Sequence, residues 1–316
     1  MAVSGSSDFT RTRDQIISRS ARLVGAIKAG ETMGSQEVTD FSEALNAMVK
    51  RWSATPGMQV WCSSEATLFP QVSQVKYDLA ASSSDHATGS YVATTIATAA
   101  ASGATSISVA SITGVASADY VGVVVDDGTI HWTTVSGAPA SATITLTTAL
   151  DAAAAVGNAV FTYTTKIGRP LKIADARRYN IASAFDTPLS KPVARLDYQA
   201  LSNKTQTGTI NQIFYDPQLA TGYLYLWQPV SAVRDLVKFT YHRPIQDFDA
   251  ASNNPDLPQE WIDVLVWNLA DMMGPEYDIP SDRAVMIGTK AAQFLNDVGG
   301  FDREAESFFL QPDMGP

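Results

Sequence analysis

The chain has 316 residues, of which 45% are hydrophobic and 9% aromatic, so it can bury a sizeable core and is not a disordered protein. The net charge of −10 disfavours a protein that grips a nucleic-acid backbone, because such binding requires clustered Lys and Arg. No apolar run approaches the ~20 residues that span a bilayer, and residues 1–7 carry neither region of a signal peptide.

The N-terminal segment predicts two helices joined by a short loop. Thr12 and Gln15 fit a capping box, in which each side chain satisfies a free amide of the first turn. The apolar residues that follow fall on one helical face, and Gly30 stands where a C-terminal stop is expected. A second helix follows the glycine, and Pro56 and Gly57 end it. Two helices with so short a link pack as an antiparallel hairpin, and the single cysteine after them, Cys62, predicts a small core residue.

Residues 84–165 differ in composition from the rest of the chain. No Lys or Arg occurs between Lys76 and Lys166, and Ala, Ser, Thr, Val and Gly dominate the segment. Short β-branched runs alternate there with turn signals, and the step from Asp127 to Gly128 tolerates the positive φ angles of a tight hairpin. About five short strands at regular spacing predict an inserted all-β domain, either a small barrel or a sandwich.

The segment after the insertion predicts strands and then helices. Extended runs at 212–217, 223–229 and 236–241 indicate a small antiparallel meander. Helices are expected from Pro258, which stands at a tolerated first-turn position, and from Ser281. The expected fold class is therefore α+β: a mainly helical domain with a small antiparallel β meander, formed by 1–83 and 166–300 and interrupted by the all-β insertion at 84–165.

The last residues, 301–316, predict a docking tail. Phe308, Phe309 and Leu310 stand among acids and prolines, and adjacent apolar residues in a free tail suit a partner better than solvent. The alternative is a tail that packs back on its own domain. Together with Phe301, these three residues are our candidates for contact with a partner protein.

Two further sets of residues predict contacts between subunits. Tyr223 and Tyr225 share one face of a strand by the period of two, with leucines on the other face, and large aromatic residues contribute strongly to interfaces. Arginines recur along the first helix, while the block from Ser252 onward holds twelve acids and three bases. Ion pairs between neighbouring subunits follow as a hypothesis. The arginines are Arg11, Arg13, Arg19 and Arg22.

The blocks on either side of the insertion resemble the podovirus tail accessory factor family, also called head-to-tail adaptors or head completion proteins. The pieces are short, but their order and spacing agree over about 9–80 and 167–298. They are Thr12–Ile17, Gly30–Thr32, Ala44–Met48 with Trp52, Ile213–Pro217, Tyr225–Pro229, Arg243 and Pro244 with Phe248, and Leu257 and Pro258 with Trp261 and Asn268–Ala270. The β insertion departs from the compact members of that family.

The resemblance implies a fold and a set of partners. It implies a mainly helical body, a ring of twelve copies beneath the portal protein, and a channel through which DNA passes without sequence-specific binding. C-terminal residues would reach the portal, and the ring would present a platform for tail nozzle or tail fibre proteins. The protein would then belong to the virion, in the phage neck and tail, after assembly in the host cytoplasm, with no membrane partner.

The sequence offers no familiar catalytic or metal-binding pattern. His86, His131 and His242 show no zinc-site spacing, and no nucleophile elbow or phosphate-binding glycine loop is present. We therefore expect no catalytic residue, no metal and no cofactor. Two alternatives stay open: a carbohydrate- or receptor-binding module in the insertion, or a peptidoglycan-degrading tail protein that uses carboxylates such as Glu31 or Glu65.

Overall fold

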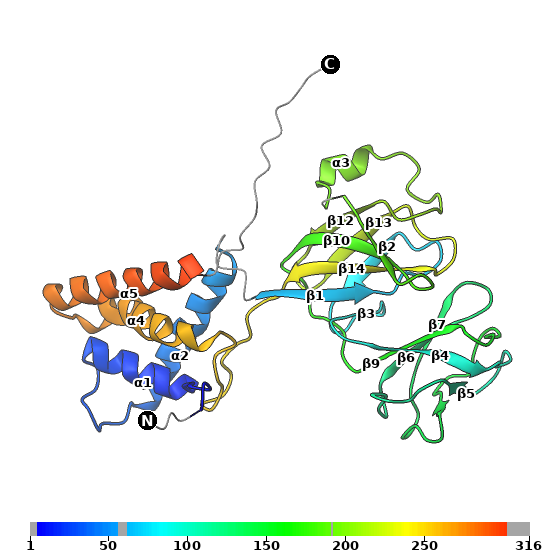
Figure 1. Ribbon diagram of the computed structural model, residues 1–316. Helices are drawn as coiled ribbons and strands as arrows, with labels where there is room; N and C mark the ends of the chain where they lie inside the picture. The colour runs from blue at the N-terminus through cyan, green and yellow to red at the C-terminus, as the bar shows by residue number, and fades with distance from the viewer. Residues whose placement is uncertain (1–4, 56–61, 191, 302–316) are drawn as a thin grey trace, which may run out of the picture. The chain divides into compact units, whose positions relative to one another are not determined.

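The computed structural model describes residues 5–55, 62–190 and 192–301. The chain divides into two compact units (Figure 1). The helical unit comprises residues 1–62 and 244–316, and the β unit comprises residues 63–243. The chain therefore leaves the helical unit once, forms the whole β unit, and returns to finish the helical unit.

The helical unit is built from α1 (Arg13–Val24), α2 (Ser35–Ser53), α4 (Ile262–Met273) and α5 (Ser281–Phe301), with short 3-10 helices at Gln259–Trp261 and Gly274–Tyr277. Helix α4 is the central member, because it packs against α1, α2 and α5. Its neighbours bury apolar faces on it, among them Ile16 and Ile17 of α1 and Phe41 and Leu45 of α2. Four amphipathic helices thus share one core.

Helix α1 ends earlier than its sequence pattern indicates. Gly25 adopts a left-handed φ of 86°, and its amide donates to the carbonyl of Ala21 at 3.0 Å. Glycine adopts this conformation without steric cost, so it closes the helix. The expected stop at Gly30 is therefore wrong by more than one turn, although Gln15 does accept the Thr12 amide at 3.2 Å as the capping box predicts.

The β unit contains a five-stranded antiparallel sheet in the order β11-β10-β14-β1-β3. Its strands are β1 (Ser63–Leu68), β3 (Ala87–Thr88), β10 (Lys172–Asn180), β11 (Phe185–Pro188) and β14 (Asp235–His242). Strand β14 lies in the middle, paired with β1 on one side and β10 on the other. Phe239 of β14 is fully buried opposite Ala66 and Ala176. Small residues beside it leave room for the ring.

A three-stranded antiparallel sheet packs beside the first, in the order β12-β13-β2. It consists of β2 (Lys76–Leu79), β12 (Gln212–Pro217) and β13 (Gly222–Trp227), with the short helix α3 (Arg195–Ala200) after β11 in the chain. The inner face carries fully buried residues such as Tyr77, Leu224 and Leu226, which join the core of the five-stranded sheet. The two sheets therefore share one apolar core.

A six-stranded antiparallel sheet takes up residues 92–163, in the order β7-β6-β9-β4-β5-β8. A bridge between Val135 and Leu146 brings the far edge back towards β7, so the sheet curls into a partly closed barrel. Its core is aliphatic and includes Val121, Val123 and Ile144, all fully buried. The strands are β4 (Val92–Thr98), β5 (Ser106–Val109), β6 (Tyr120–Val124), β7 (Ile130–Thr134), β8 (Thr143–Thr145) and β9 (Ala159–Tyr163).

An aromatic cluster joins the six-stranded sheet to the rest of the β unit. We call it the junction cluster, and it centres on Phe69, whose ring lies 5.1 Å from that of Phe161 and 5.2 Å from that of Trp132. Leu236 of β14 belongs to the same cluster. The curled sheet is thus fixed to the five-stranded sheet by side-chain packing as well as by the chain that connects them.

The expected fold class, a mainly helical domain around a β insertion, is wrong. Only 26% of the chain is helical, and the larger of the two units is built from three antiparallel sheets. The segment after residue 166, which we expected to belong with the helices, contributes β10, β11, β12, β13 and β14 to the β unit. The expected meander also fails, because β14 leaves β12 and β13 and pairs with β1. Apolar residues are buried between strands that lie far apart in the sequence, and this burial sets which strands pair.

Candidate functional site

The outer face of the three-stranded sheet is rich in aromatic residues. Alternation along β13 places Tyr223, Tyr225 and Trp227 outward and half-buried, whereas the leucines between them are fully buried. We call this the aromatic face. Tyr225 lies opposite Phe214 of β12, with ring centroids 5.5 Å apart. Tyr223 and Tyr225 therefore share one face, and the leucines share the other.

Helix α3 covers part of the aromatic face. Tyr198 packs on Phe214 with ring centroids 5.2 Å apart, and Arg195 forms an ion pair with Asp216 at the end of β12. Outside this cover, the ammonium of Lys76 lies 3.5 Å from the centre of the Tyr223 ring. The face thus carries cations over half-buried and buried aromatic rings, an arrangement that stabilises both groups.

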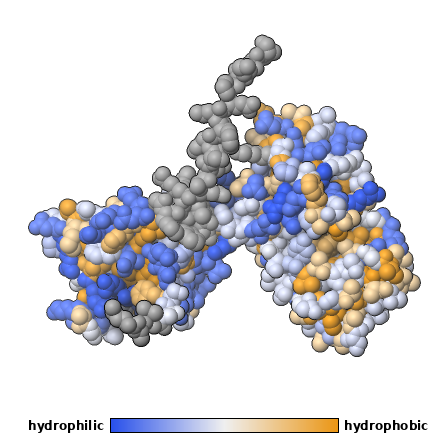
Figure 2. Space-filling model, in the orientation of Figure 1, coloured by the Kyte–Doolittle hydropathy of each residue, from blue (hydrophilic) through white to orange (hydrophobic). Residues whose placement is uncertain are grey.

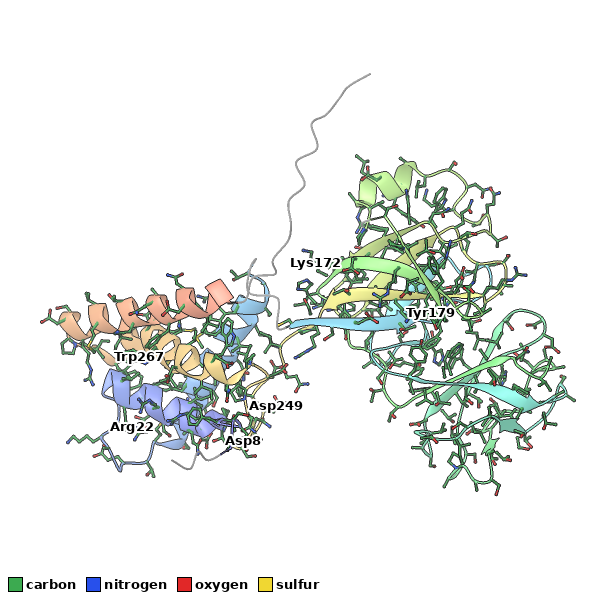
Figure 3. All side chains as sticks on the ribbon, in the orientation of Figure 1. Asp8, Arg22, Lys172, Tyr179, Asp249 and Trp267 are labelled. Atoms are coloured by element: carbon green, nitrogen blue, oxygen red, sulfur yellow. The ribbon has the colours of Figure 1, made fainter. Side chains whose placement is uncertain are left out.

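Of the four predicted arginines, Arg19 and Arg22 are exposed on α1, whereas Arg11 precedes the helix and is half-buried. Arg13 is mostly buried, with an exposed side-chain fraction of 14%, and its Nη2 lies 2.9 Å from Asp14 Oδ1. Arg11, Arg19 and Arg22 form no ion pair with any residue that the structure describes. Arg22 lies near the end of α1, on the outside of the helical unit (Figure 3). Three of the predicted contacts are therefore free of acidic partners in the described part of the chain.

The predicted docking tail falls mainly outside the described residues. Phe301 is the last residue of α5, and Phe308, Phe309 and Leu310 lie beyond residue 301, in the part that the structure does not describe. In the described range no helix is long and apolar enough to cross a membrane.

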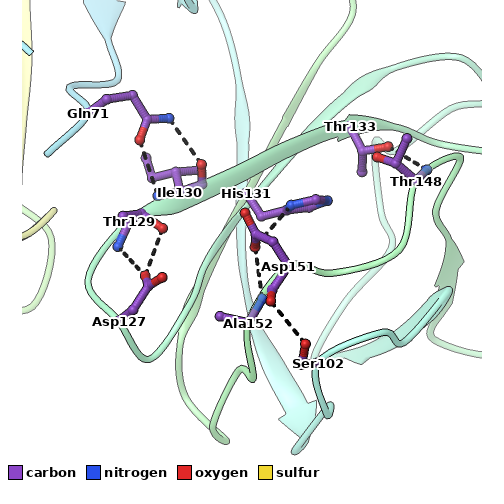
Figure 4. A network of polar contacts seen from close by, with 10 residues as sticks. All are labelled: Gln71, Ser102, Asp127, Thr129, Ile130, His131, Thr133, Thr148, Asp151 and Ala152. Atoms are coloured by element: carbon purple, nitrogen blue, oxygen red, sulfur yellow. Dashed lines mark hydrogen bonds and ion pairs between the residues drawn. The ribbon is translucent and has the colours of Figure 1, made fainter.

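His131 lies in a polar network of the six-stranded sheet (Figure 4). Its Nδ1 is 3.1 Å from the carboxylate of Asp151, and the adjacent Thr133 hydroxyl accepts the amide of Thr148 at 2.9 Å. His131 Nε2 is buried without a hydrogen-bond partner in the structure. These contacts attach the loop around Asp151 to β7, which is a structural role. Within the described ranges, no three His, Cys, Asp or Glu residues group closely enough to hold a metal ion.

The carboxylates considered for catalysis each hold a local structural contact. Glu31 accepts the amide of Lys28 at 2.7 Å in the loop before α2. Glu65 of β1 pairs with Arg177 of β10 across the five-stranded sheet. Each of these acids is thus engaged in a backbone or ion-pair contact within its own unit.

A pocket of about 290 Å³ lies where the six-stranded sheet meets the junction cluster. The sequence did not predict it, because its residues come from separate segments. One signal was present, since Lys166 is the first cation after the cation-free segment. The pocket is lined by His86, Tyr120, Trp132, Thr133, Thr134, Thr147, Thr148 and Lys166.

Comparison with known proteins assigns no function to these surfaces. No protein-family model matches the chain, and no curated protein matches it either.

Proposed function

We propose that the chain is a structural subunit of a phage neck, a head-to-tail adaptor that assembles into a ring between the portal and the tail. The ring would continue the DNA channel and carry out no reaction of its own. The resemblance of the ordered sequence pieces to tail accessory factors supplies the class of protein. The observation that carries the proposal is the aromatic face, which suits contact with another copy of the chain.

The aromatic face has the composition of a subunit interface. Interfaces are enriched in Tyr and Trp, which bury a large area with few rotatable bonds. Near the same sheet, Leu196 of α3 and Leu219 of the β12–β13 turn are 76% and 98% exposed. The exposure of this apolar surface to water is unfavourable. A neighbouring subunit that covered Tyr223 and Tyr225 would remove it from water.

Charge supplies a second, weaker contribution to assembly. Arg19 and Arg22 on α1, and Arg11 just before it, have no acidic partner among the described residues, and the block from Ser252 onward is strongly acidic. In a ring, the arginines of one copy would meet the acids of the next. Exposed ion pairs contribute only ~0–1 kcal/mol each, so they would direct the approach of subunits more than stabilise the ring.

The proposal assigns the remaining parts of the chain to other partners. Residues 302–316, together with Phe301, would contact the portal through Phe308, Phe309 and Leu310. The six-stranded sheet would meet a tail nozzle or tail fibre protein. Its surface carries few charges, and in the view of Figure 2 most of it is pale to orange rather than strongly hydrophilic.

Imaging of the chain mixed with its portal tests the ring directly. We expect rings of a single rotational symmetry, twelvefold by the resemblance, in electron micrographs of the mixture. A chain without residues 302–316 should keep its fold and lose portal binding. If the chain stays monomeric at all concentrations, with and without portal, the proposal is wrong.

Two variants distinguish the contribution of the aromatic face to ring formation from the contribution of the charged residues. Tyr223→Ser should weaken ring formation at any salt concentration, because it removes apolar contact area. Arg19→Glu should weaken it mainly at low salt, because screening already reduces ion pairing at high salt. Arg51→Glu is the matched control, since Arg51 is an exposed arginine at the end of α2. Sedimentation velocity measures all three, and equal effects of Arg19→Glu and Arg51→Glu would remove the charge contribution.

A further inference from the structure

The pocket beside the junction cluster holds a positive charge that forms no ion pair with any described residue. The ammonium of Lys166 is half-buried and donates to the carbonyls of Ser83 and Ser84, at 2.6 and 3.3 Å. Neither carbonyl carries a charge, and no described carboxylate forms an ion pair with Lys166. Asp85, the nearest acid in sequence, directs its oxygens to the Asp78 amide and the Gln74 side chain. Burial lowers the pKa of Lys166, and the charge of Asp85 offsets only part of this effect, so an anion beside the ammonium would further favour its charged form.

One N–H group of the Lys166 ammonium is available for a further hydrogen bond. A lysine ammonium has three protons, and two of them are directed to the carbonyls of Ser83 and Ser84. The ammonium also lies 4.8 Å from the centre of the Tyr120 ring, on the side of the pocket. A ligand oxygen in the pocket can therefore accept the third proton, and charge-assisted hydrogen bonds of this kind are stronger than neutral ones.

Threonine hydroxyls line another part of the pocket. The Thr147 hydroxyl donates to the Thr134 carbonyl at 3.0 Å and accepts from the Thr134 hydroxyl at 2.8 Å, so both hydroxyls keep lone pairs that can accept from a ligand. Thr148 is exposed and uses its backbone amide to bond Thr133, which leaves its hydroxyl for a ligand. Two hydroxyls that accept, beside one that both donates and accepts, suit a ligand that is itself rich in hydroxyl groups.

The aromatic rings of the pocket offer edges rather than free faces. Trp132 is covered by the stacked ring of His86, 3.8 Å away, and its six-membered ring lies directly over Gly122. The Tyr120 ring is stacked on Tyr163, with centroids 5.1 Å apart, and the Lys166 ammonium lies 4.8 Å from its centre. Ring edges carry partial positive charge. They therefore favour oxygen atoms and anions, and a sugar cannot stack on them as it does on an open tryptophan.

We propose that this pocket binds an acidic sugar residue, a hydroxylated ring with one carboxylate. The carboxylate would lie against the Lys166 ammonium, and the ring hydroxyls would meet Thr134, Thr147 and Thr148. The pocket volume of about 290 Å³ is at the lower limit of small-molecule sites, which fits a single sugar residue. The inference goes beyond the ring-forming role and does not depend on it.

A titration of the full chain with sodium glucuronate tests the proposal, with glucose and phosphate as matched probes. We expect saturable binding of glucuronate with a dissociation constant of about 1 mM, near −4 kcal/mol by the standard conversion, in calorimetry or ligand-observed NMR at low salt. Glucose should bind at least tenfold more weakly, because it lacks the charge. Phosphate should also bind at least tenfold more weakly, because it lacks the ring hydroxyls.

Variants of the pocket locate the binding. Lys166→Gln should weaken glucuronate binding about tenfold, and Thr148→Val about threefold, while Lys172→Gln leaves it unchanged. Lys172 is an exposed lysine on β10 outside the pocket (Figure 3). Thr148→Val keeps the backbone bond to Thr133, so it preserves the fold if Lys166→Gln does not. The inference is overturned if glucuronate shows no saturation up to about 20 mM, if glucose or phosphate binds equally well, or if Lys172→Gln has the same effect as Lys166→Gln.

Discussion

Two parts of the β unit are both antiparallel sheet, yet they are built in different ways. In the six-stranded sheet every strand pairs with others from residues 92–163. In the other two sheets, strands from before the insertion pair with strands from after it, as β1 does with β14 and β2 with β13. The first sheet is local in sequence, and the others close only after more than a hundred residues have been bridged.

The difference shows what a local pattern can reveal. Turn signals and short β-branched runs mark a sheet whose partners lie close along the chain. Strand β2 has no partner close in sequence, and the only one of β1 is the two-residue β3, so their pairing with β13 and β14 leaves no local signal. Pairing across a long loop costs entropy that grows slowly with length, and the shared apolar core of Tyr77, Leu224 and Phe239 offsets it.

The largest predicted effect tests whether the two parts unfold together. Phe239→Ala removes the fully buried ring at the centre of the five-stranded sheet and should cost ~3–5 kcal/mol. Ile144→Ala, in the core of the six-stranded sheet, should cost ~2–5 kcal/mol. Because the junction cluster connects the parts, each variant should lower hydrogen-exchange protection in both. If Phe239→Ala leaves residues 92–163 fully protected, the parts are independent.

A smaller effect depends on pH and on His86, which lies between the parts. Burial lowers the pKa of His86 to about 3, from 6.5 for a free histidine. The unfolded chain takes up a proton below pH 6.5 that the folded chain excludes, so stability is complete above that pH and falls as the pH falls towards 3. Between pH 7 and pH 5 the loss should be about 2 kcal/mol.

The variant His86→Phe isolates that contribution, because it keeps a ring on Trp132 and cannot titrate. Urea unfolding at both pH values measures the change. The wild type should lose about 2 kcal/mol more than the variant over this range. Equal losses in the two proteins would show that other groups account for the pH dependence.

The smallest effect concerns the ion pair between Glu65 and Arg177, which spans strands separated in sequence by the insertion. Its side chains are 51% and 27% exposed, and exposed pairs contribute ~0–1 kcal/mol. Glu65→Gln should therefore change the unfolding free energy by less than about 1 kcal/mol in urea titrations at low salt. A larger loss would indicate that this pair, rather than the buried core, aligns β1 with β10.

The sequence predicted the helical elements and the strands of residues 92–163 better than the arrangement of the rest. Three-residue and four-residue spacing marked α1, α2, α4 and α5, because each has one apolar face against the core. The alternation along β13 placed Tyr223 and Tyr225 together. Pairing of β14 with β1 could not be predicted, because the register depends on partners far away in sequence.

The candidate sites differ in the same way: some are visible as local patterns in the sequence, and one is formed only by the fold. Arginines on a helix and tyrosines on a strand are visible as repeats in the sequence, so they could be nominated in advance. The pocket near Lys166 combines the residue before β3, strands β6 and β7, the loop after β8, and the first residue after the insertion. No local spacing connects these residues. Only the fold brings the ammonium to the threonine wall.

The pairing of β1 with β14 has a consequence for how the molecule can change. Ser63 and His242 lie opposite each other in the register, and the boundaries between the two units follow directly, at 62/63 and 243/244. Opposed residues of antiparallel strands stand only ~5 Å apart. The β unit is therefore an inserted domain whose two ends lie side by side. Insertions with adjacent ends are tolerated well, so the helical unit could carry a different inserted domain at this place without changes to its own core.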